Sequence, residues 1–148
     1  MNDPPPASAE VAAVAEANDR FYRALEAADL AAMESLWLQT DWVRCVHPGW
    51  ELLAGWPQVR ESWARIFQHS RGLRVMPGDV AIRIAGDFAW VSCTEHLMIF
   101  DENSAAPVSV MTTATNLFQR VGGEWRMVLH HASPVPTVIP VNESETVQ

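Results

Sequence analysis

The stretch ATNLFQRVGGEWRMVLHHASP, residues 114–134, places an apolar-rich segment on each side of Gly122 and Gly123. Its leucine, phenylalanine, valine and tryptophan residues are of types that favour β-strands. Two consecutive glycines adopt the positive φ angles of a tight hairpin turn at little cost. The stretch therefore predicts two long antiparallel strands joined by a short turn.

The residues before this hairpin repeat the pattern and extend the predicted sheet. Four strands are expected, over residues 73–85, 88–100, 108–121 and 124–133. The turn at Gly86-Asp87 is tight and the loop over 101–107 is longer, which is typical of an antiparallel meander. A shorter strand is expected over residues 42–47.

The first half of the chain has the period of α-helices instead. After Ala9, apolar residues recur at spacings of three, seven and four, which predicts an amphipathic helix. Asp29 is placed to cap a second helix that runs to Trp37, and Pro57 suits the first turn of a third. Helices followed by a run of antiparallel strands predict an α+β fold, with the helices covering one face of the sheet.

The 148 residues are enough for one domain and too few for two. We expect a flexible lead over residues 1–8, a single domain over 9–136 and a tail over 137–148, because proline is frequent at both ends. Hydrophobic residues make up 49% of the chain and charged residues 19%, as in folded globular proteins.

Charge and composition argue against several classes of partner. The formal net charge is -8 and the ten basic residues, all of them arginine, are scattered, so nucleic acid is not an expected partner. No apolar run reaches the length of a membrane span, and the first residues do not resemble a secretion signal. We therefore expect a cytoplasmic protein with no membrane partner and no cofactor.

The predicted strand over residues 88–100 carries apolar residues on both of its faces. Helices can cover only one face of the sheet, so a second copy of the chain is expected to bury the other, through the last three strands. The sequence thus predicts a homodimer. The two faces consist of Val91, Cys93, Leu97 and Ile99 on one side, and of Trp90, Met98 and Phe100 on the other.

Several motifs accompany these elements: HPGWE (47–51), GWPQVRESW (55–63), ATNLFQR (114–120), the glycine pair and WRMVLHHASP (125–134). With them, the chain resembles the nuclear transport factor two-like superfamily over residues 9–136, in its SnoaL-like, ketosteroid isomerase-related branch. The resemblance implies a cone in which three helices close a strongly curved sheet around a deep pocket. Relatives include isomerases, cyclases, dehydratases, hydrolases and oligomerising domains, so the fold alone does not identify an activity.

The resemblance also implies a site. The isomerase-type site has an aspartate base directly before a proline, where this chain has His47, and a protonated aspartate where it has Asn116. Histidine can act as a base near neutral pH, and an asparagine amide can donate to a developing oxyanion. The tyrosine of that site falls on Phe21, and Tyr22 is expected to point elsewhere. Losing such a donor costs on the order of 3 kcal/mol, which disfavours steroid isomerisation.

His47 has two further interpretations. It can be a structural histidine that hydrogen-bonds a backbone carbonyl near the Pro48-Gly49 corner. It also lies two residues after Cys45, and a thiol beside a histidine is the arrangement of a nucleophilic cysteine. The simpler expectation is that Cys45 and Cys93 are free, buried thiols.

His131 is expected to assist His47 and Asn116. It is in phase with Trp125 and Met127 along the last strand, so these side chains should share the inward face while His130 points outward. Adjacent histidines on a regular strand cannot both bind one metal ion, and no carboxylate is spaced to join them. No metal site is expected.

Other polar residues on apolar faces need a partner or a ligand. Asn18 lies on the apolar stripe of the first helix and either hydrogen-bonds a neighbouring loop or contacts a ligand. Glu95 interrupts an apolar strand face and is expected to pair with Arg44 or Arg83, or else to lie in a polar pocket. The expected ligand contacts are Asn18, Phe21, Trp50, Trp63 and Met127.

These observations favour a cavity that binds a small hydrophobic or carbonyl-bearing molecule. If the protein is an enzyme, the reaction expected is proton abstraction next to a carbonyl or activation of water, of isomerase, lyase or hydrolase type, with His47 as the base. The alternative is a non-catalytic domain for homo-oligomerisation or ligand sensing.

Overall fold

The computed structural model describes residues 6–100, 103 and 105–136; the expected tail over 137–148 lies outside them. Three helices and two short strands precede four long strands, and this order confirms the α+β fold. The elements are α1 (Pro6–Ala27), α2 (Leu30–Leu36), β1 (Arg44–Val46), β2 (Leu53–Ala54), α3 (Trp56–His69), β3 (Leu73–Ala85), β4 (Phe88–Ile99), β5 (Val108–Val121) and β6 (Glu124–Pro134). None of the described helices is long and apolar enough to cross a membrane.

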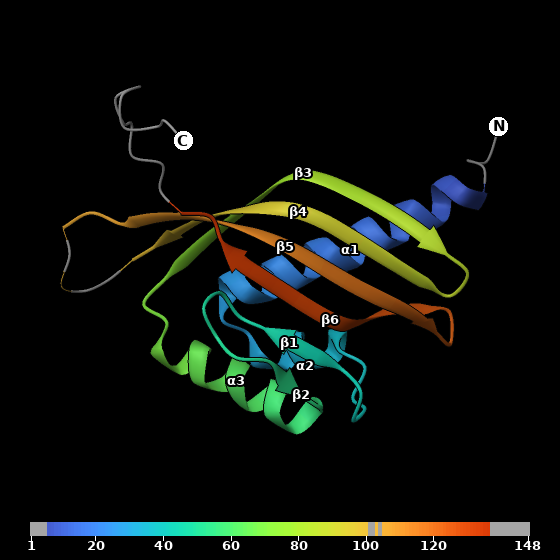
Figure 1. Ribbon diagram of the computed structural model, residues 1–148, viewed down its shortest axis with the longest axis horizontal. Helices are drawn as coiled ribbons and strands as arrows, with labels where there is room; N and C mark the ends of the chain where they lie inside the picture. Colours follow the sequence, from blue (N-terminus) through green and yellow to red (C-terminus); the bar gives the residue numbers. More distant parts are fainter. Residues whose placement is uncertain (1–5, 101–102, 104, 137–148) are drawn as a thin grey trace, which may run out of the picture.

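The strands form one sheet in the order β2-β1-β6-β5-β4-β3. The four long strands make the predicted antiparallel meander, whereas β1 pairs with β6 in parallel. The sheet curves along α1, with α2 and α3 beside β1 and β2 at one end (Figure 1). The helices therefore enclose the interior from one side of the sheet.

Several local signals act as the sequence predicts. The Asp29 side chain caps α2 by accepting a hydrogen bond from the backbone N–H of Ala32 at 3.0 Å. Pro57 lies in the first turn of α3. Both hairpin glycines have positive φ, 58° at Gly122 and 81° at Gly123, as the tight turn requires. The first helix begins at Pro6, three residues earlier than expected.

A bulge in β6 changes which of the two adjacent histidines faces inward. Leu117 of β5 pairs with Leu129, but the next residue, Phe118, pairs with Met127, so Val128 is an extra residue in the ladder. Met127 and Val128 are both buried, and the alternation restarts after them in the opposite phase.

The prediction for the histidine pair is therefore wrong. His130 is 3% exposed and faces the interior, whereas His131 is exposed on the other face of the sheet. A regular two-residue period assigns His131 to the interior, and the extra residue in β6 moves His130 there instead.

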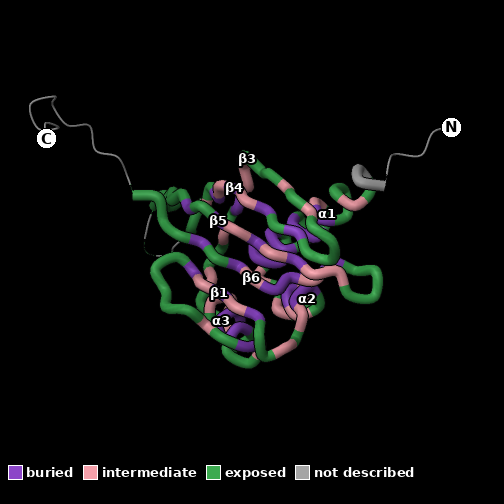
Figure 2. Tube along the Cα trace, turned by 45° about the vertical axis from the view of Figure 1, so that its right-hand side comes forward, coloured by how far each residue is buried: buried purple, intermediate pink, exposed green. Residues whose placement is uncertain are grey.

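Buried residues gather between the sheet and the helices, and exposed residues lie on the outside (Figure 2). The outer face of the sheet nevertheless carries large apolar side chains, including Trp90, which is 44% exposed, and Met98, which is 40% exposed. This pattern agrees with the predicted apolar outer face. A second copy of the chain on that face stays a prediction.

Candidate functional site

A cavity of about 390 Å³ opens between α3, the loop after β1 and the strands β4, β5 and β6. Most of its lining is apolar, with four polar side chains: His47, Glu95, Thr112 and His130. The apolar lining consists of Leu25, Pro48, Trp50, Trp63, Ile66, Leu73, Leu97, Ile99, Val110, Met111, Pro134 and Val135.

His47 is held by a short hydrogen-bond chain at the end of β1. Its Nε2 lies 2.8 Å from the hydroxyl of Ser62, and that hydroxyl donates to the backbone carbonyl of Val59 at 2.7 Å. Because Ser62 has a single hydroxyl hydrogen, it accepts from His47, so Nε2 carries the imidazole proton. The indoles of Trp50 and Trp63 meet the ring edge to face, with centroids 4.8 and 4.6 Å away.

His130 has the opposite tautomer. Its Nδ1 lies 2.6 Å from Oδ1 of Asn116, a carbonyl oxygen that can only accept, so Nδ1 carries the proton. Asn116 does not line the cavity whereas His130 does, and the ring edge opposite Nδ1 is the edge left for the cavity. The unprotonated Nε2 of His130 is thus an acceptor at the polar end of the cavity.

Asn116 is completely enclosed and connects three elements. Its amide nitrogen donates to Oδ1 of Asn18 at 2.9 Å and to the Tyr22 hydroxyl at 3.1 Å, while its oxygen accepts from His130. Asn116 is 0% exposed. Its hydrogens therefore serve partners inside the protein, and Asn116 orients His130 instead of facing a ligand.

Tyr22 points into this network, contrary to the sequence prediction. Its hydroxyl donates to Oε2 of Glu95 at 2.6 Å and lies 3.2 Å from the thiol of Cys93. Burial, together with the charge of Glu95, raises the pKa of Tyr22, so the phenol stays protonated. Phe21, the residue that the resemblance aligned with the family's tyrosine, packs instead against the ring of His130 at 4.7 Å.

Glu95 is not placed in the ion pair that the sequence favours. Its two carboxylate oxygens accept from the hydroxyls of Tyr22 and Thr112. The Arg44 guanidinium donates to the backbone carbonyls of Asp41 and Val43. Two neutral hydroxyl donors thus replace the expected arginine, and Glu95 lies at the polar end of a mostly apolar cavity.

The hydrogen bonds from His130 to Glu95 all run in one direction. His130 donates to Asn116, Asn116 donates to Tyr22, and Tyr22 donates to Glu95. Successive bonds of one direction polarise one another. The carboxylate of Glu95 therefore strengthens the bond that fixes the proton on Nδ1 of His130, although the two side chains are linked only through others.

The structure brings together some of the predicted contacts and not others. His47, Trp50 and Trp63 line the cavity. Asn18 is buried and hydrogen-bonds Asn116. Of its two predicted roles, the internal hydrogen bond is therefore the one observed, with a partner in β5 and not in a loop. Phe21 and Met127, which were also predicted as ligand contacts, are buried and do not line the cavity. Sequence reasoning missed His130, Tyr22, Glu95 and Thr112 as members of one site.

Both inward histidines are neutral at pH 7. Burial lowers the pKa of His130 to about 3, with a smaller contribution from His131, and burial lowers the pKa of His47 to about 3, with a smaller contribution from His130. The ring centroids of His47 and His130 lie 6.4 Å apart. Two neutral imidazoles therefore share one end of the cavity.

These shifts predict a loss of stability in acid. Between pH 6.5 and about 3, His47 and His130 bind protons in the unfolded chain and not in the folded chain. The contribution of these two histidines to the free energy of unfolding is therefore fully present above pH 6.5. Below pH 6.5 the free energy of unfolding falls by up to about 1.4 kcal/mol per pH unit for each histidine. Urea unfolding at pH 7 and pH 5 should show this slope reduced in His47→Gln and unchanged in His69→Gln, at an exposed site. An equal slope in both variants contradicts it.

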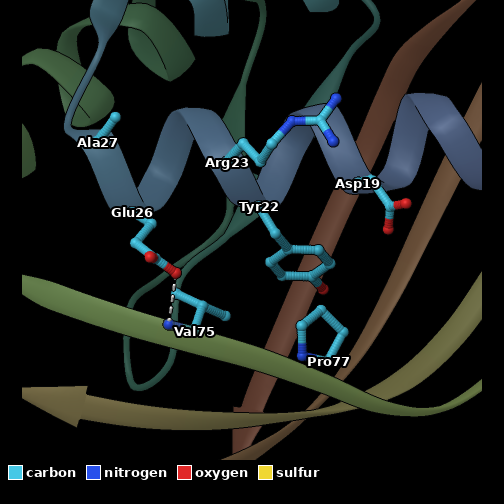
Figure 3. A pocket seen from close by; sticks show the side chains of 7 residues that line it. All are labelled: Asp19, Tyr22, Arg23, Glu26, Ala27, Val75 and Pro77. Atoms are coloured by element: carbon cyan, nitrogen blue, oxygen red, sulfur yellow. Dashed lines mark hydrogen bonds between the residues drawn. The ribbon is translucent and has the colours of Figure 1, made fainter.

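A separate groove of about 380 Å³ lies outside the cavity, between α1 and β3. Figure 3 shows Tyr22 reaching from α1 toward Pro77, and Glu26 accepting a hydrogen bond from the backbone N–H of Val75 at 3.1 Å. The aromatic ring of Tyr22 thus borders this groove while its hydroxyl joins the buried network. Among the described residues, no three histidine, cysteine or acidic side chains are grouped to hold a metal ion.

Comparison with protein families supports the same architecture. A model of the SnoaL-like domain matches residues 14–137. F-box protein SKIP8 of Arabidopsis thaliana is 33% identical over 121 residues, which make up 82% of this chain and 49% of that protein. The chain thus spans about half the length of this curated relative.

Solved structures add neighbours of different kinds. A proposed dehydratase of the NTF2-like family from Streptomyces avermitilis is 34% identical with a TM-score of 0.81, covering 88% of this chain and 99% of that one. A proposed calcium/calmodulin-dependent protein kinase type II association domain from Thiobacillus denitrificans is 34% identical with a TM-score of 0.72, covering 81% and 93%. A proposed ketosteroid isomerase from Shewanella frigidimarina, 18% identical with a TM-score of 0.67 and coverage of 80% and 92%, shares the fold.

Proposed function

The chain belongs to the SnoaL-like domain family, and from that premise we propose that it is an acid–base enzyme of dehydratase or isomerase type, acting on a small apolar molecule. The observation that carries the proposal is the unprotonated Nε2 of His130 at the polar end of an apolar cavity. A neutral imidazole with a fixed tautomer is a general base that needs no deprotonation at pH 7.

The surroundings of His130 support this role. Asn116 holds its Nδ1–H as an orienting partner does in other base-catalysed sites, so that the lone pair on Nε2 has one direction. The apolar lining gives the base a surrounding of low polarity, which strengthens its electrostatic interactions. The sequence predicted His47 as the base with His131 as its helper, but His131 is exposed on the other face of the sheet and cannot assist at the cavity.

A dehydration uses these groups with balanced atoms. Nε2 of His130 takes a proton from the carbon next to a carbonyl, and the electron pair of that bond forms the new carbon–carbon double bond. The carbon–oxygen bond to the leaving hydroxyl breaks, and the imidazolium passes its proton to that oxygen, which leaves as water. An isomerisation differs only in that the proton returns to another carbon. His47, the second neutral imidazole, accepts a hydrogen bond from the substrate.

The 34% identical dehydratase candidate from Streptomyces avermitilis supports the choice of dehydration over hydrolysis. The experiment is incubation of the protein with 3-hydroxy-1-indanone, a β-hydroxy ketone with an apolar bicyclic skeleton, in D₂O. We expect enzyme-dependent exchange of the proton next to the carbonyl and release of the dehydrated product, both followed by NMR. A panel of such ketones with neither exchange nor elimination contradicts the proposal.

Homo-oligomeric association is a second candidate function. The exposed side chains of Trp90 and Met98 on the outer sheet face favour it, as does the 34% identity to the proposed kinase association domain. The occupant proposed for this face is a second copy of the chain. Sedimentation at micromolar concentration should give a dimer or a larger assembly, and the Trp90→Glu variant should shift it toward single chains. A wild-type monomer contradicts association.

A further inference from the structure

The polar groups that line the cavity have no hydrogens left to donate. The proton of His47 is used by Ser62, that of His130 by Asn116, and the hydroxyl hydrogen of Thr112 by Glu95. What these side chains can still offer a ligand is acceptor capacity, on imidazole nitrogen and on carboxylate oxygen.

The remaining lining residues do not change this balance. The indole N–H of Trp63 is fully buried and finds no partner among the described residues, so it is not presented to the cavity. Trp50 lies at the rim, where its side chain is exposed to solvent. The backbone N–H groups of β4, β5 and β6 belong to a paired ladder. The inner end of the cavity, formed by His47, Glu95, Thr112 and His130, therefore presents only hydrogen-bond acceptors, and we call it the acceptor wall.

The two histidines keep this character over the neutral pH range. A protonated imidazole would donate from both nitrogens, but burial holds the pKa of His47 and His130 at about 3. Among the described residues that line the cavity, Glu95 is the one charged group beside the two histidines. Its carboxylate can only accept hydrogen bonds.

We propose that the cavity selects small apolar molecules whose buried polar end donates a hydrogen bond, such as an alcohol or a phenol, over matched carbonyl compounds. A hydroxyl group placed against Nε2 of His130 recovers the hydrogen bond that it made with water. A carbonyl oxygen placed there meets only lone pairs and loses its water partners without replacement. The inference deepens the proposed function, on which it rests, by naming the group that the site recognises.

This preference is the reverse of the one that the resemblance implied. A site that polarises a carbonyl presents donors, whereas here Asn116 donates to Asn18 and Tyr22, and Tyr22 donates to Glu95. In a substrate that carries both groups, the hydroxyl donates to His47 at the acceptor wall, which leaves Nε2 of His130 to take the carbon-bound proton, and the carbonyl points toward the mouth beside Trp50. The leaving group of a dehydration is such a hydroxyl.

The test is binding of a matched pair of probes, 2-tetralol and 2-tetralone, which share a carbon skeleton and differ at one oxygen. Calorimetric titration of the wild-type protein should give a dissociation constant at least tenfold lower for the alcohol. His130→Leu, which removes the acceptor, should bring the two constants together, and Leu97→Ala, a change in the apolar lining, should weaken both alike.

Equal or tighter binding of the ketone by the wild type overturns the inference, and so does binding of neither probe. The wild-type comparison decides the matter even if His130→Leu does not fold. Turnover of a hydroxy ketone without a preference for the alcohol probe leaves the proposed function standing and removes the inference. A preference for the alcohol probe without turnover of any hydroxy ketone removes the proposed function and leaves the binding preference standing.

Discussion

Replacing His130 with glutamine should lower the rate of the proposed reaction by about 10²-fold or more, while replacing its neighbour His131 with glutamine leaves the rate within about twofold. General-base catalysis contributes at least this much, and of the two adjacent histidines only His130 has its free nitrogen at the cavity. The measurement is kcat and kcat/KM of the purified variants on one hydroxy ketone substrate. His131→Gln is a matched control because it makes the same change one residue away, on the exposed face.

The opposite ranking contradicts the assignment. If His131→Gln lost activity and His130→Gln kept it, the last strand would have the phase expected from its sequence, without the bulge at Val128. Equal loss in both variants would mean that the pair acts through the stability of the strand. Urea unfolding of both variants separates that effect from catalysis.

Replacing Asn116 with leucine should lower the free energy of unfolding by about 3 kcal/mol or more. The substitution keeps the branched skeleton of the side chain but removes the hydrogen-bond partner of His130, Tyr22 and Asn18 at once, inside a fully buried cluster. Each buried group left without a partner costs about 1–3 kcal/mol. Chemical denaturation at pH 7 measures the change.

Thr113→Val is the control for this prediction, because Thr113 lies on the same strand and is exposed on its outer face. We expect it to change stability by no more than about 0.5 kcal/mol. If Asn116→Leu lowers the free energy of unfolding no more than Thr113→Val does, the buried polar cluster is not assembled as described.

Local signals were sufficient for most of the fold. The period of the strands, the paired glycines at 122 and 123, the cap at Asp29 and Pro57 all depend on neighbours in sequence, and the structure places each as predicted. The two-residue strand at Leu53 was missed because it is too short to show a period.

The inward face of the last strand could not be read from its sequence. Met127, Val128 and Leu129 are all apolar, so either phase of a two-residue period fits them. The bulge is defined by pairing with Leu117 and Phe118 on another strand. Which of the two histidines enters the cavity is therefore decided by a tertiary contact.

Tyr22 was missed for a different reason. A single apolar stripe on α1 accommodates Phe21 but not its neighbour, whereas α1 contacts both β3 and β6 and buries a wider face. One signal was present, because Tyr22 follows Asn18 by four residues and so lies directly above it on the helix. Two polar residues at that spacing on a buried face indicate an internal network.

Glu95 illustrates the limit of pairing by charge. The expectation of an arginine followed from the cost of an unpaired buried carboxylate, and that cost is met here by two hydroxyl groups. Thr112 pairs with Glu95 across the sheet, a neighbour fixed by the register of β4 and β5. Without that register, the sequence could not distinguish a cross-strand threonine from a distant arginine.

The most direct measurement is ¹⁵N NMR of the histidine side chains, with His130 assigned by comparison with His130→Gln. At pH 7 the account predicts a proton on Nδ1 and none on Nε2 of His130, with no titration of this ring between pH 8 and pH 5. A proton on Nε2, or a ring that titrates near pH 6.5 like an exposed histidine, would contradict the claim that His130 is the oriented base of the cavity.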